Sequence, residues 1–202
     1  MVTLQYLEDS EPMRSMINDW SERKRICVLG AGHRPLTQDN AHWFNGLEGI
    51  GQYEALNVDI RDYDTTDFVQ DLSRKKWDLP SNHFDIVIAE HVAEHVPDRL
   101  AFIAECRRIT KNNGLLIIEV PNWKHDSAHN TLEHCSTWGR AIFNDSYINE
   151  YGALWKIEKV VYRMTRPFSW KSFYVKGEFL GRQLDRFTSK ISGLRFFIRI
   201  KK

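Results

Sequence analysis

A short apolar run that ends at two glycines constrains the fold of this chain more than any other stretch. Residues 26–29 read Ile-Cys-Val-Leu, and Gly30, Ala31 and Gly32 follow directly. Four apolar residues bounded by glycine predict a buried strand, and the glycines leave bare backbone at its carboxyl end. Ligands of α/β folds approach the sheet at strand ends of this kind. The sequence therefore predicts a binding site at Leu29–Gly32.

A second strand is predicted over 55–60, and it ends in Asp59 and Ile60. A carboxylate at this strand end can accept hydrogen bonds from both hydroxyls of a ribose. The separation of 27 residues between Gly32 and Asp59 is longer than the usual spacing of about 20. A solvated turn aspartate is the alternative, because three further aspartates follow within eight residues.

Two more strand ends are predicted to reach the same edge of the sheet. A short strand over 67–72 ends in Asp71 and Leu72, where Asp71 is either a site residue or the N-cap of the next turn. The strand over 84–89 is nearly continuously apolar, as a central parallel strand covered on both faces should be. Glu90 and His91 follow it, before a predicted helix over 98–110.

The rest of the chain continues the alternation of strands and helices. Alternation of this kind predicts a parallel sheet with helices on both faces. Gly114 is the predicted left-handed cap of the helix before the fifth strand. The charges in 195–202 are interpreted as solvated side chains of an edge or inserted strand. Further helices are predicted over 11–24, 38–47, 139–151 and 171–190, and strands over 115–120, 154–163 and 194–200.

Composition restricts the kinds of partner. The 202 residues suit one domain, and 42% of them are hydrophobic, which argues against disorder. The formal charge of +1 gives no electrostatic case for binding nucleic acid. Three cysteines without metal spacing favour a reducing compartment, so we expect a cytoplasmic location. The N-terminus does not read as a signal peptide, and no apolar run is long enough to span a bilayer. The oligomeric state stays open.

The stretch 84–122, FDIVIAEHVAEHVPDRLAFIAECRRITKNNGLLIIEVPN, resembles the fourth and fifth strands of small class I S-adenosylmethionine-dependent methyltransferases. The resemblance implies one Rossmann-like α/β domain over 1–202. Its sheet would be mostly parallel and seven-stranded, with an antiparallel last strand. An N-terminal helix (1–24) would precede a cofactor-binding half (25–122) and an acceptor-side half (123–202).

The same resemblance implies S-adenosyl-L-methionine as the cofactor and assigns the strand ends to its parts. Leu29, Gly30, Ala31 and Gly32 match the first motif of the family. Asp59, with Ile60 beside it, matches the ribose-binding acid, and Asp71-Leu72 the pair beside the adenine. Glu90 and His91 match the lip that flanks the methionine end.

Methyl transfer to a hydroxyl requires a nearby base, and the loop over 122–138 is rich in histidine. An imidazole can take a proton near neutral pH. The candidate bases are the histidines His95, His125, His129 and His134, with Glu94 and Asp126 as second choices. His125 and His134 are preferred because both lie in the loop expected to cover the acceptor. For any one loop histidine, an exposed or merely hydrogen-bonded role is the alternative.

Two metal hypotheses arise from the same histidines. His91–His95 spells the H-x-x-E-H arrangement of zinc peptidases, but Pro97 disfavours the helix which that chemistry needs. A looser site for Mg²⁺ or Mn²⁺ among His125, Asp126, His129 and His134 is the side hypothesis. No metal ligands are assigned.

The acceptor is expected to carry a hydroxyl. The D/N-P-P-Y tetrapeptide that the family uses for planar nitrogens is absent after the fourth strand, where EHVAEHV stands. A sugar or glycan is the leading acceptor, and Trp123, Trp138 and Trp170 are candidates for stacking on it. An inactive binding module and a nicotinamide-dependent oxidoreductase are the alternatives.

Overall fold

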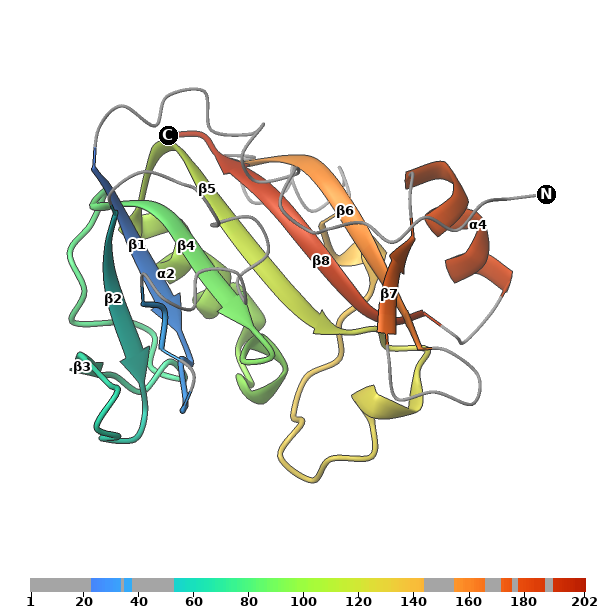
Figure 1. Ribbon diagram of the computed structural model, residues 1–202, viewed down its shortest axis with the longest axis horizontal. Helices are drawn as coiled ribbons and strands as arrows, with labels where there is room; N and C mark the ends of the chain where they lie inside the picture. Colours follow the sequence, from blue (N-terminus) through green and yellow to red (C-terminus); the bar gives the residue numbers. More distant parts are fainter. Residues whose placement is uncertain are drawn as a thin grey trace.

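The computed structural model describes residues 23–33, 35–37, 53–143, 155–165, 172–175, 178–187 and 191–202. They form one eight-stranded sheet in the order β3-β2-β1-β4-β5-β8-β6-β7 (Figure 1). The elements, in chain order, are β1 (Lys24–Leu29), β2 (Tyr53–Asp59), β3 (Phe68–Val69), β4 (Phe84–Glu90), the 3₁₀ helix η2 (Ala93–His95), α2 (Arg99–Ile109), β5 (Thr110–Pro121), the 3₁₀ helices η3 (Asp126–Ala128) and η4 (Arg140–Phe143), β6 (Trp155–Thr165), β7 (Ser172–Val175), α4 (Glu178–Phe187) and β8 (Ile191–Ile200).

The first five strands are parallel, and the last strand is inserted in the opposite direction. β8 pairs antiparallel with both β5 and β6, while β1 to β5 pair only in parallel with one another. The prediction of a Rossmann-like, mostly parallel sheet with an antiparallel last strand is therefore confirmed. Because β1, β2, β3 and β4 run the same way, their carboxyl ends meet at one edge of the sheet.

The sheet has one strand more than predicted. The segment 171–190 was expected to be a helix, but β7 occupies its start and pairs with β6, and α4 follows. The Ser-Phe-Tyr-Val sequence of β7 is rich in residues that favour strands. β3 is also shorter than the predicted 67–72.

Both faces of the sheet are buried. In β1, Cys27 and Leu29 belong to one apolar cluster and Ile26 and Val28 to a second one. Alternate residues of a strand point to opposite faces, so apolar layers cover both sides. α2 covers the first face, behind the sheet in Figure 1. The predicted helices over 11–24 and 38–47, and most of the one over 139–151, lie outside the described residues.

The passage from α2 into β5 differs from the prediction. Asp98 caps the start of α2 by accepting a hydrogen bond from the Ala101 amide. At the other end Asn113, with φ of 61°, holds the left-handed position that was predicted for Gly114. Gly114 is required for another reason, since a Cβ there would lie 2.7 Å from Thr110 Cγ2.

The charges of the last strand were predicted to be solvated, and for Arg195 this is wrong. Arg195 is 5% exposed and pairs with Glu119 of β5. The Arg199 side chain pairs with Glu158 of β6. Only Lys201 and Lys202, beyond the strand, are exposed as expected. Arg195 is buried because β8 lies between two other strands rather than at an edge, and Glu119 compensates its charge.

Among the described residues, no helix is long and apolar enough to cross a membrane. The three cysteines are free thiols, of which Cys27 and Cys106 are buried and Cys135 is exposed. Burial raises the pKa of both buried thiols.

Candidate active site

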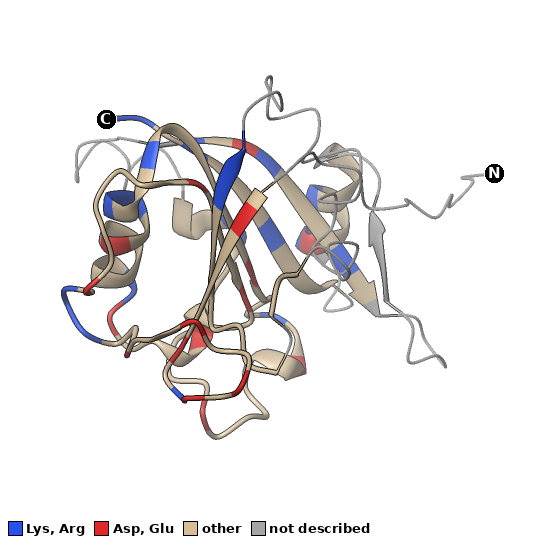
Figure 2. Ribbon diagram, turned by 60° about the vertical axis from the view of Figure 1, so that its left-hand side comes forward, with Lys and Arg blue, Asp and Glu red and all other residues tan. Residues whose placement is uncertain are grey.

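A cavity of about 390 Å³ opens at the carboxyl ends of β1, β2 and β4. This edge of the sheet is where ligands of parallel α/β folds bind, and its loops carry several of the acidic residues in Figure 2. Five of the predicted cofactor residues line the cavity, namely Gly30, Asp59, Ile60, Asp71 and Leu72. The segment after β4 forms the opposite wall with Val92, His95, Val96 and Pro97.

The glycine turn after β1 packs directly against this wall. Gly30 and Gly32 have φ values of 66° and 54°, which favour glycine. A Cβ on Gly30 would lie 2.6 Å from Val92 Cγ2, so only glycine fits between the turn and the lip of β4. Leu29 and Ala31 are buried beneath the turn and support it rather than line the cavity.

Asp59 ties the ends of β1 and β2 together. Its Oδ2 accepts a hydrogen bond of 2.9 Å from the Gly32 amide, and its Oδ1 accepts one of 3.0 Å from the Arg61 amide. The residue is only 8% exposed, so the solvated turn considered from the sequence is wrong. Each carboxylate oxygen keeps a second lone pair, and the side chain borders the cavity. Asp59 is therefore placed to accept hydrogen bonds from a ligand.

Asp71 caps the next turn and also lines the cavity. Its Oδ1 accepts hydrogen bonds from the Ser73 amide and hydroxyl, at 2.9 and 2.6 Å, as a turn cap does. These bonds from Ser73 lower the pKa of Asp71. The residue also lines the cavity, next to the buried Leu72 and the exposed Ile60. The two apolar side chains give this end of the cavity an apolar wall.

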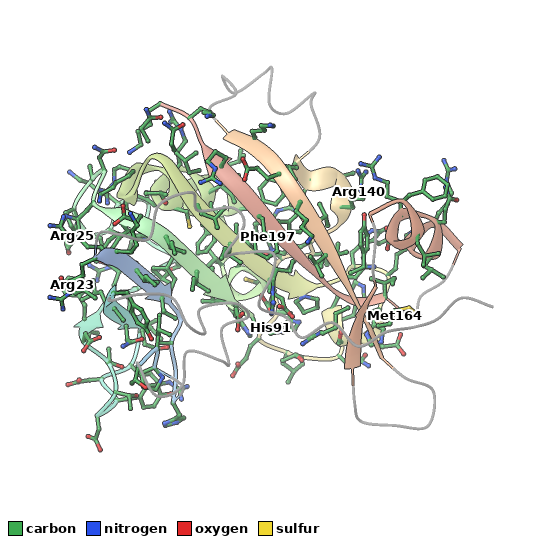
Figure 3. All side chains as sticks on the ribbon, turned by 45° about the horizontal axis from the view of Figure 1, so that its top comes forward. Arg23, Arg25, His91, Arg140, Met164 and Phe197 are labelled. Carbon is green, nitrogen blue, oxygen red and sulfur yellow. The ribbon has the colours of Figure 1, made fainter. Side chains whose placement is uncertain are left out.

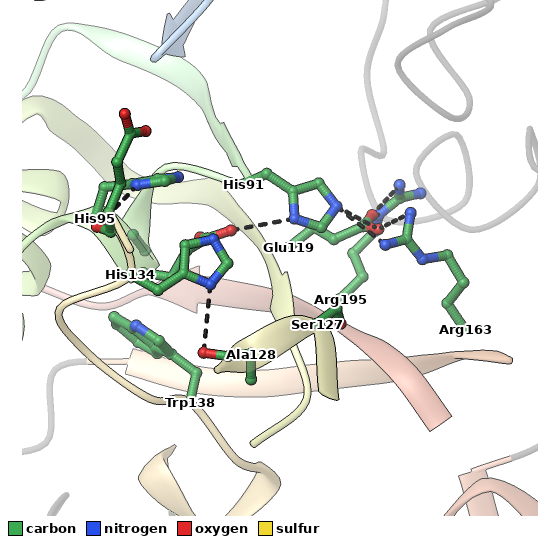
Figure 4. Close-up of polar contacts among 12 residues, drawn as sticks. His91, His95, Glu119, Ser127, Ala128, His134, Trp138, Arg163 and Arg195 are labelled. Atoms are coloured by element: carbon green, nitrogen blue, oxygen red, sulfur yellow. Dashed lines mark hydrogen bonds and ion pairs between the residues drawn. The ribbon is translucent and has the colours of Figure 1, made fainter. Parts of the chain in front are cut away.

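Glu90 and His91 do not line this cavity. They belong to an ion cluster formed with Glu119 of β5, Arg163 of β6 and Arg195 of β8 (Figure 4). Arg195 is in contact with Glu119, and its Nη2 lies 3.3 Å from Glu90 Oε1. Burial by itself raises the pKa of Glu119, but Arg195, His91 and Arg163 outweigh it and hold that pKa well below its usual range. Burial raises the pKa of Glu90.

His91 sits between two carboxylates. The residue has a φ of 53° and lies near the centre of the view in Figure 3. Its Nδ1 is 3.2 Å from Glu94 Oε1, and its Nε2 is 3.5 Å from Glu119 Oε1. Burial by itself would lower the pKa of His91, but the contacts with Glu119 and Glu94 raise it to about 9. The side chain is therefore a cation at neutral pH and not a general base.

The raised pKa of His91 predicts a specific pH dependence in the metal-free protein. Its ring proton resonance should titrate near pH 9, compared with about 6.5 in an unfolded chain. Because the folded pKa is the higher one, the stabilisation is complete below pH 6.5 and disappears as the pH rises through 9. The side chain is 41% exposed, so solvent screening reduces the effect to about 1 kcal/mol.

The His91→Gln variant is compared with the parent protein. The unfolding free energy of both is measured in urea between pH 6 and pH 10. The difference in unfolding free energy between the two proteins should shrink across that range. A difference that stays constant, or a resonance that titrates near 6.5, would contradict the protonated assignment.

The structure brings together two of the predicted histidine bases. His95 lines the cavity, and its ring meets that of His134 edge to face, with centroids 4.8 Å apart. His125 lies apart from them, because its Nδ1 accepts a hydrogen bond from the Ser127 amide at the start of η3. His129, of the looser metal set, is held with Nε2 2.6 Å from the Trp123 carbonyl. Only His134 of that set joins a group of possible ligands among the described residues.

Sequence reasoning named Glu90 and His91 but missed their partners in the ion cluster, Glu119, Arg163 and Arg195. Glu119 stands inside the apolar run Leu-Leu-Ile-Ile-Glu-Val, and Arg195 stands inside an equally apolar strand. A charged residue in the middle of an apolar strand signals a buried partner, since an unpaired buried charge is costly. The close packing of Val92 against Gly30 could not be predicted, because nothing in the local sequence indicates that these two residues meet.

Comparisons with known proteins agree with this fold. Residues 51–118 match the methyltransferase domain family. Among solved structures, an S-adenosylmethionine-dependent methyltransferase from Archaeoglobus fulgidus has a TM-score of 0.60 at 19% identity, covering 94% of this chain and 91% of that one. A putative sarcosine dimethylglycine methyltransferase from Galdieria sulphuraria also has a TM-score of 0.60, at 12% identity over 94% of this chain and 83% of that one.

The matches to curated proteins are shorter. A ubiquinone biosynthesis O-methyltransferase of Rhodopseudomonas palustris is 49% identical over 47 residues, which cover 22% of this chain and 18% of the relative. A probable S-adenosylmethionine-dependent methyltransferase of Mycobacterium tuberculosis is 39% identical over 44 residues, covering 22% of this chain and 16% of that protein. The matched segments thus span less than a fifth of either relative.

The chain has a Rossmann-like fold with a cavity at the strand ends. Residues 51–118 match the methyltransferase domain family, and the fold is that of solved S-adenosylmethionine-dependent methyltransferases, which supports the resemblance drawn from the sequence.

Proposed function

We propose that this protein transfers a methyl group from S-adenosylmethionine to the oxygen of a hydroxyl-bearing small molecule. The observation that carries the proposal is the cavity at the strand ends, where the Gly30 backbone is bare and the buried Asp59 presents a carboxylate. A cavity of about 390 Å³ falls within the roughly 300–1,000 Å³ of small-molecule sites.

The residues of the cavity fit an adenosyl group part by part. The Asp59 carboxylate suits a pair of ribose hydroxyls, and Ile60 with Leu72 suits the faces of a purine. Gly30 lines the cavity with its backbone, and the absence of a side chain lets the turn pack against Val92 on the opposite wall. When bound, S-adenosylmethionine supplies an electrophilic methyl group, whose carbon–sulfur bond breaks as the acceptor oxygen forms its new bond.

The acceptor would bind beside His95. This side chain borders the cavity and meets His134 of the loop over 122–138. The acceptor hydroxyl must lose its proton as the carbon–oxygen bond forms, and these two imidazoles are the groups that could accept it.

The curated relatives support an oxygen acceptor, since ubiquinone biosynthesis O-methyltransferases share the matched segment. A sugar hydroxyl is the acceptor class that the loop suggests, because Trp123 is 50% exposed and can stack on a sugar ring. Trp138 cannot take this role because it is buried, and Trp170 lies outside the described residues.

Two measurements test the proposal. Isothermal titration with S-adenosylmethionine, S-adenosylhomocysteine and NAD should give binding of the first two only. Mass spectrometry of sugars and phenols incubated with the protein and S-adenosylmethionine should then show the gain of one methyl group on oxygen.

Other outcomes would overturn specific parts of the proposal. Binding of NAD alone would favour an oxidoreductase, and silence with all three ligands would favour an inactive binding domain. Methylation on nitrogen alone would refute the hydroxyl acceptor. Methylation of phenols but not of sugars would refute the sugar acceptor.

A further inference from the structure

Three side chains with metal-binding atoms converge beside the cavity. Glu94 and His95 come from η2, and His134 comes from the loop over 122–138. One possible ligand atom of each lies within 4.8 Å of the other two. These residues are here called the Glu94–His134 cluster.

One carboxylate oxygen of the cluster has no hydrogen-bond partner among the residues that the structure describes. Glu94 is 2% exposed, and its Oε1 lies 3.2 Å from His91 Nδ1. Its Oε2 is buried without a hydrogen bond from any residue that the structure describes. A buried, unpaired carboxylate oxygen costs free energy, and a bound cation removes that cost.

Both histidines have the arrangement of metal-binding imidazoles. The Nδ1 atoms of His95 and His134 lie 3.2 and 3.3 Å from the Glu133 and Ala128 carbonyls (Figure 4). If Nδ1 carries the proton for this bond, Nε2 is left with a lone pair. Imidazoles that bind metals are typically oriented in this way by a hydrogen bond from the other ring nitrogen.

The backbone holds the two halves of the cluster together. The amides of Cys135 and Ser136 both donate to the Glu94 carbonyl, each over 3.0 Å. The Ser136 hydroxyl donates to the Ala93 carbonyl over 3.1 Å. The loop that carries His134 is thus fixed on η2, so a metal ion would find its ligands largely in position.

We propose that Glu94, His95 and His134 form a binding site for a divalent transition metal, for which Zn²⁺ is the probe. Two imidazoles and one carboxylate suit zinc and similar ions, whereas Mg²⁺ prefers oxygen ligands. Two ligands on one zinc ion lie at most about 4.2 Å apart, so at least one side chain must rotate inward. Three protein ligands leave a coordination position open.

The open position gives the ion a role that rests on the proposed function. His95 borders the cavity, so an acceptor hydroxyl can occupy that position. The charge of the ion lowers the pKa of the hydroxyl, which releases its proton to solvent before its oxygen attacks. His95 and His134 then act as ligands of the ion rather than as bases.

The test is zinc binding by the full chain, without S-adenosylmethionine and without acceptor. The exposed Cys135 is first replaced by serine, so that its thiol does not contribute. Calorimetry should show one Zn²⁺ per chain, and millimolar Mg²⁺ should not compete. Addition of Co²⁺ should give the visible absorption of an ion with nitrogen ligands.

The ligand variants are His134→Ala and Glu94→Gln, and the control is His129→Ala on the same loop. His134→Ala should weaken Zn²⁺ binding at least about tenfold, whereas His129→Ala should not change it. Equal binding by His134→Ala and its parent, or an equal loss in His129→Ala, overturns the site. If Glu94→Gln is poorly folded by circular dichroism, the His134 comparison decides, because that residue lies on a partly exposed loop.

Activity is measured separately from binding. If Zn²⁺ binds as expected but methyl transfer is indifferent to its removal, the role for the acceptor is wrong while the site stands. If no methyl transfer is found at all, the proposed function fails, and the binding result still decides the metal site.

Discussion

Asp59→Ala is expected to weaken S-adenosylmethionine binding by at least about 10- to 100-fold. A hydrogen bond to a charged group contributes about 1.5–3 kcal/mol, and each 1.4 kcal/mol is about tenfold in affinity. The Asp59 carboxylate also accepts hydrogen bonds from the Gly32 and Arg61 amides, so the variant loosens the glycine turn as well. Isothermal titration measures the change.

The control for this prediction is Asp64→Ala, an exposed aspartate five residues further along the chain. It should bind S-adenosylmethionine as the parent does. Circular dichroism must show that both variants are folded. Unchanged affinity in a folded Asp59→Ala protein would contradict the assignment of this carboxylate to the cofactor.

Arg195→Met is expected to destabilise the fold by about 3–5 kcal/mol, the usual cost of removing one partner of a buried ion pair. Arg195 is 5% exposed, and it pairs with both Glu119 and Glu90. Without it, the buried Glu119 and the partly exposed Glu90 are left to the remaining cations of the cluster. Urea unfolding at pH 7 measures the change in free energy.

Lys111→Met is the matched control, because its pair with Asp85 is partly exposed. It should cost less than about 1 kcal/mol. A second comparison adds Glu119→Gln to Arg195→Met, and the coupling of the two changes should exceed about 1 kcal/mol. Additive effects, or a cost for Arg195→Met no larger than for Lys111→Met, would show that the buried pair does not stabilise the fold.

The sequence predicts the parallel half of the sheet well, because its strands carry their own signals. The apolar runs of β1 and β4 end at glycines or polar residues, and both appear as buried strands. The C-terminal half is less predictable, since pairing with neighbours decides its structure. The strand over 154–163 was predicted and appears as β6, but β7 was assigned to a helix because its pairing with β6 is a contact of the tertiary structure.

In the candidate site, too, residues at strand ends could be predicted from the sequence, whereas contacts between loops could not. Gly30 and Asp59 were predicted from their positions at strand ends, and they line one cavity. His134 and Glu94 meet only because the loop over 122–138 folds back onto η2. The hydrogen bonds that hold the loop there join backbone atoms, so no pattern of side chains in the sequence predicts them. His125, preferred equally with His134 from the sequence, instead caps η3. Contacts between loops depend on the tertiary structure and are not encoded in a local spacing.

A crystal structure with S-adenosylhomocysteine tests the central claim most directly. We predict that the ligand occupies the cavity lined by Gly30, Asp59 and Val92, with its ribose hydroxyls within hydrogen-bond distance of Asp59 and its adenine beside Ile60 and Leu72. A ligand bound elsewhere on the chain, or one in the cavity without a contact to Asp59, would contradict the assignment of this sheet edge to the cofactor.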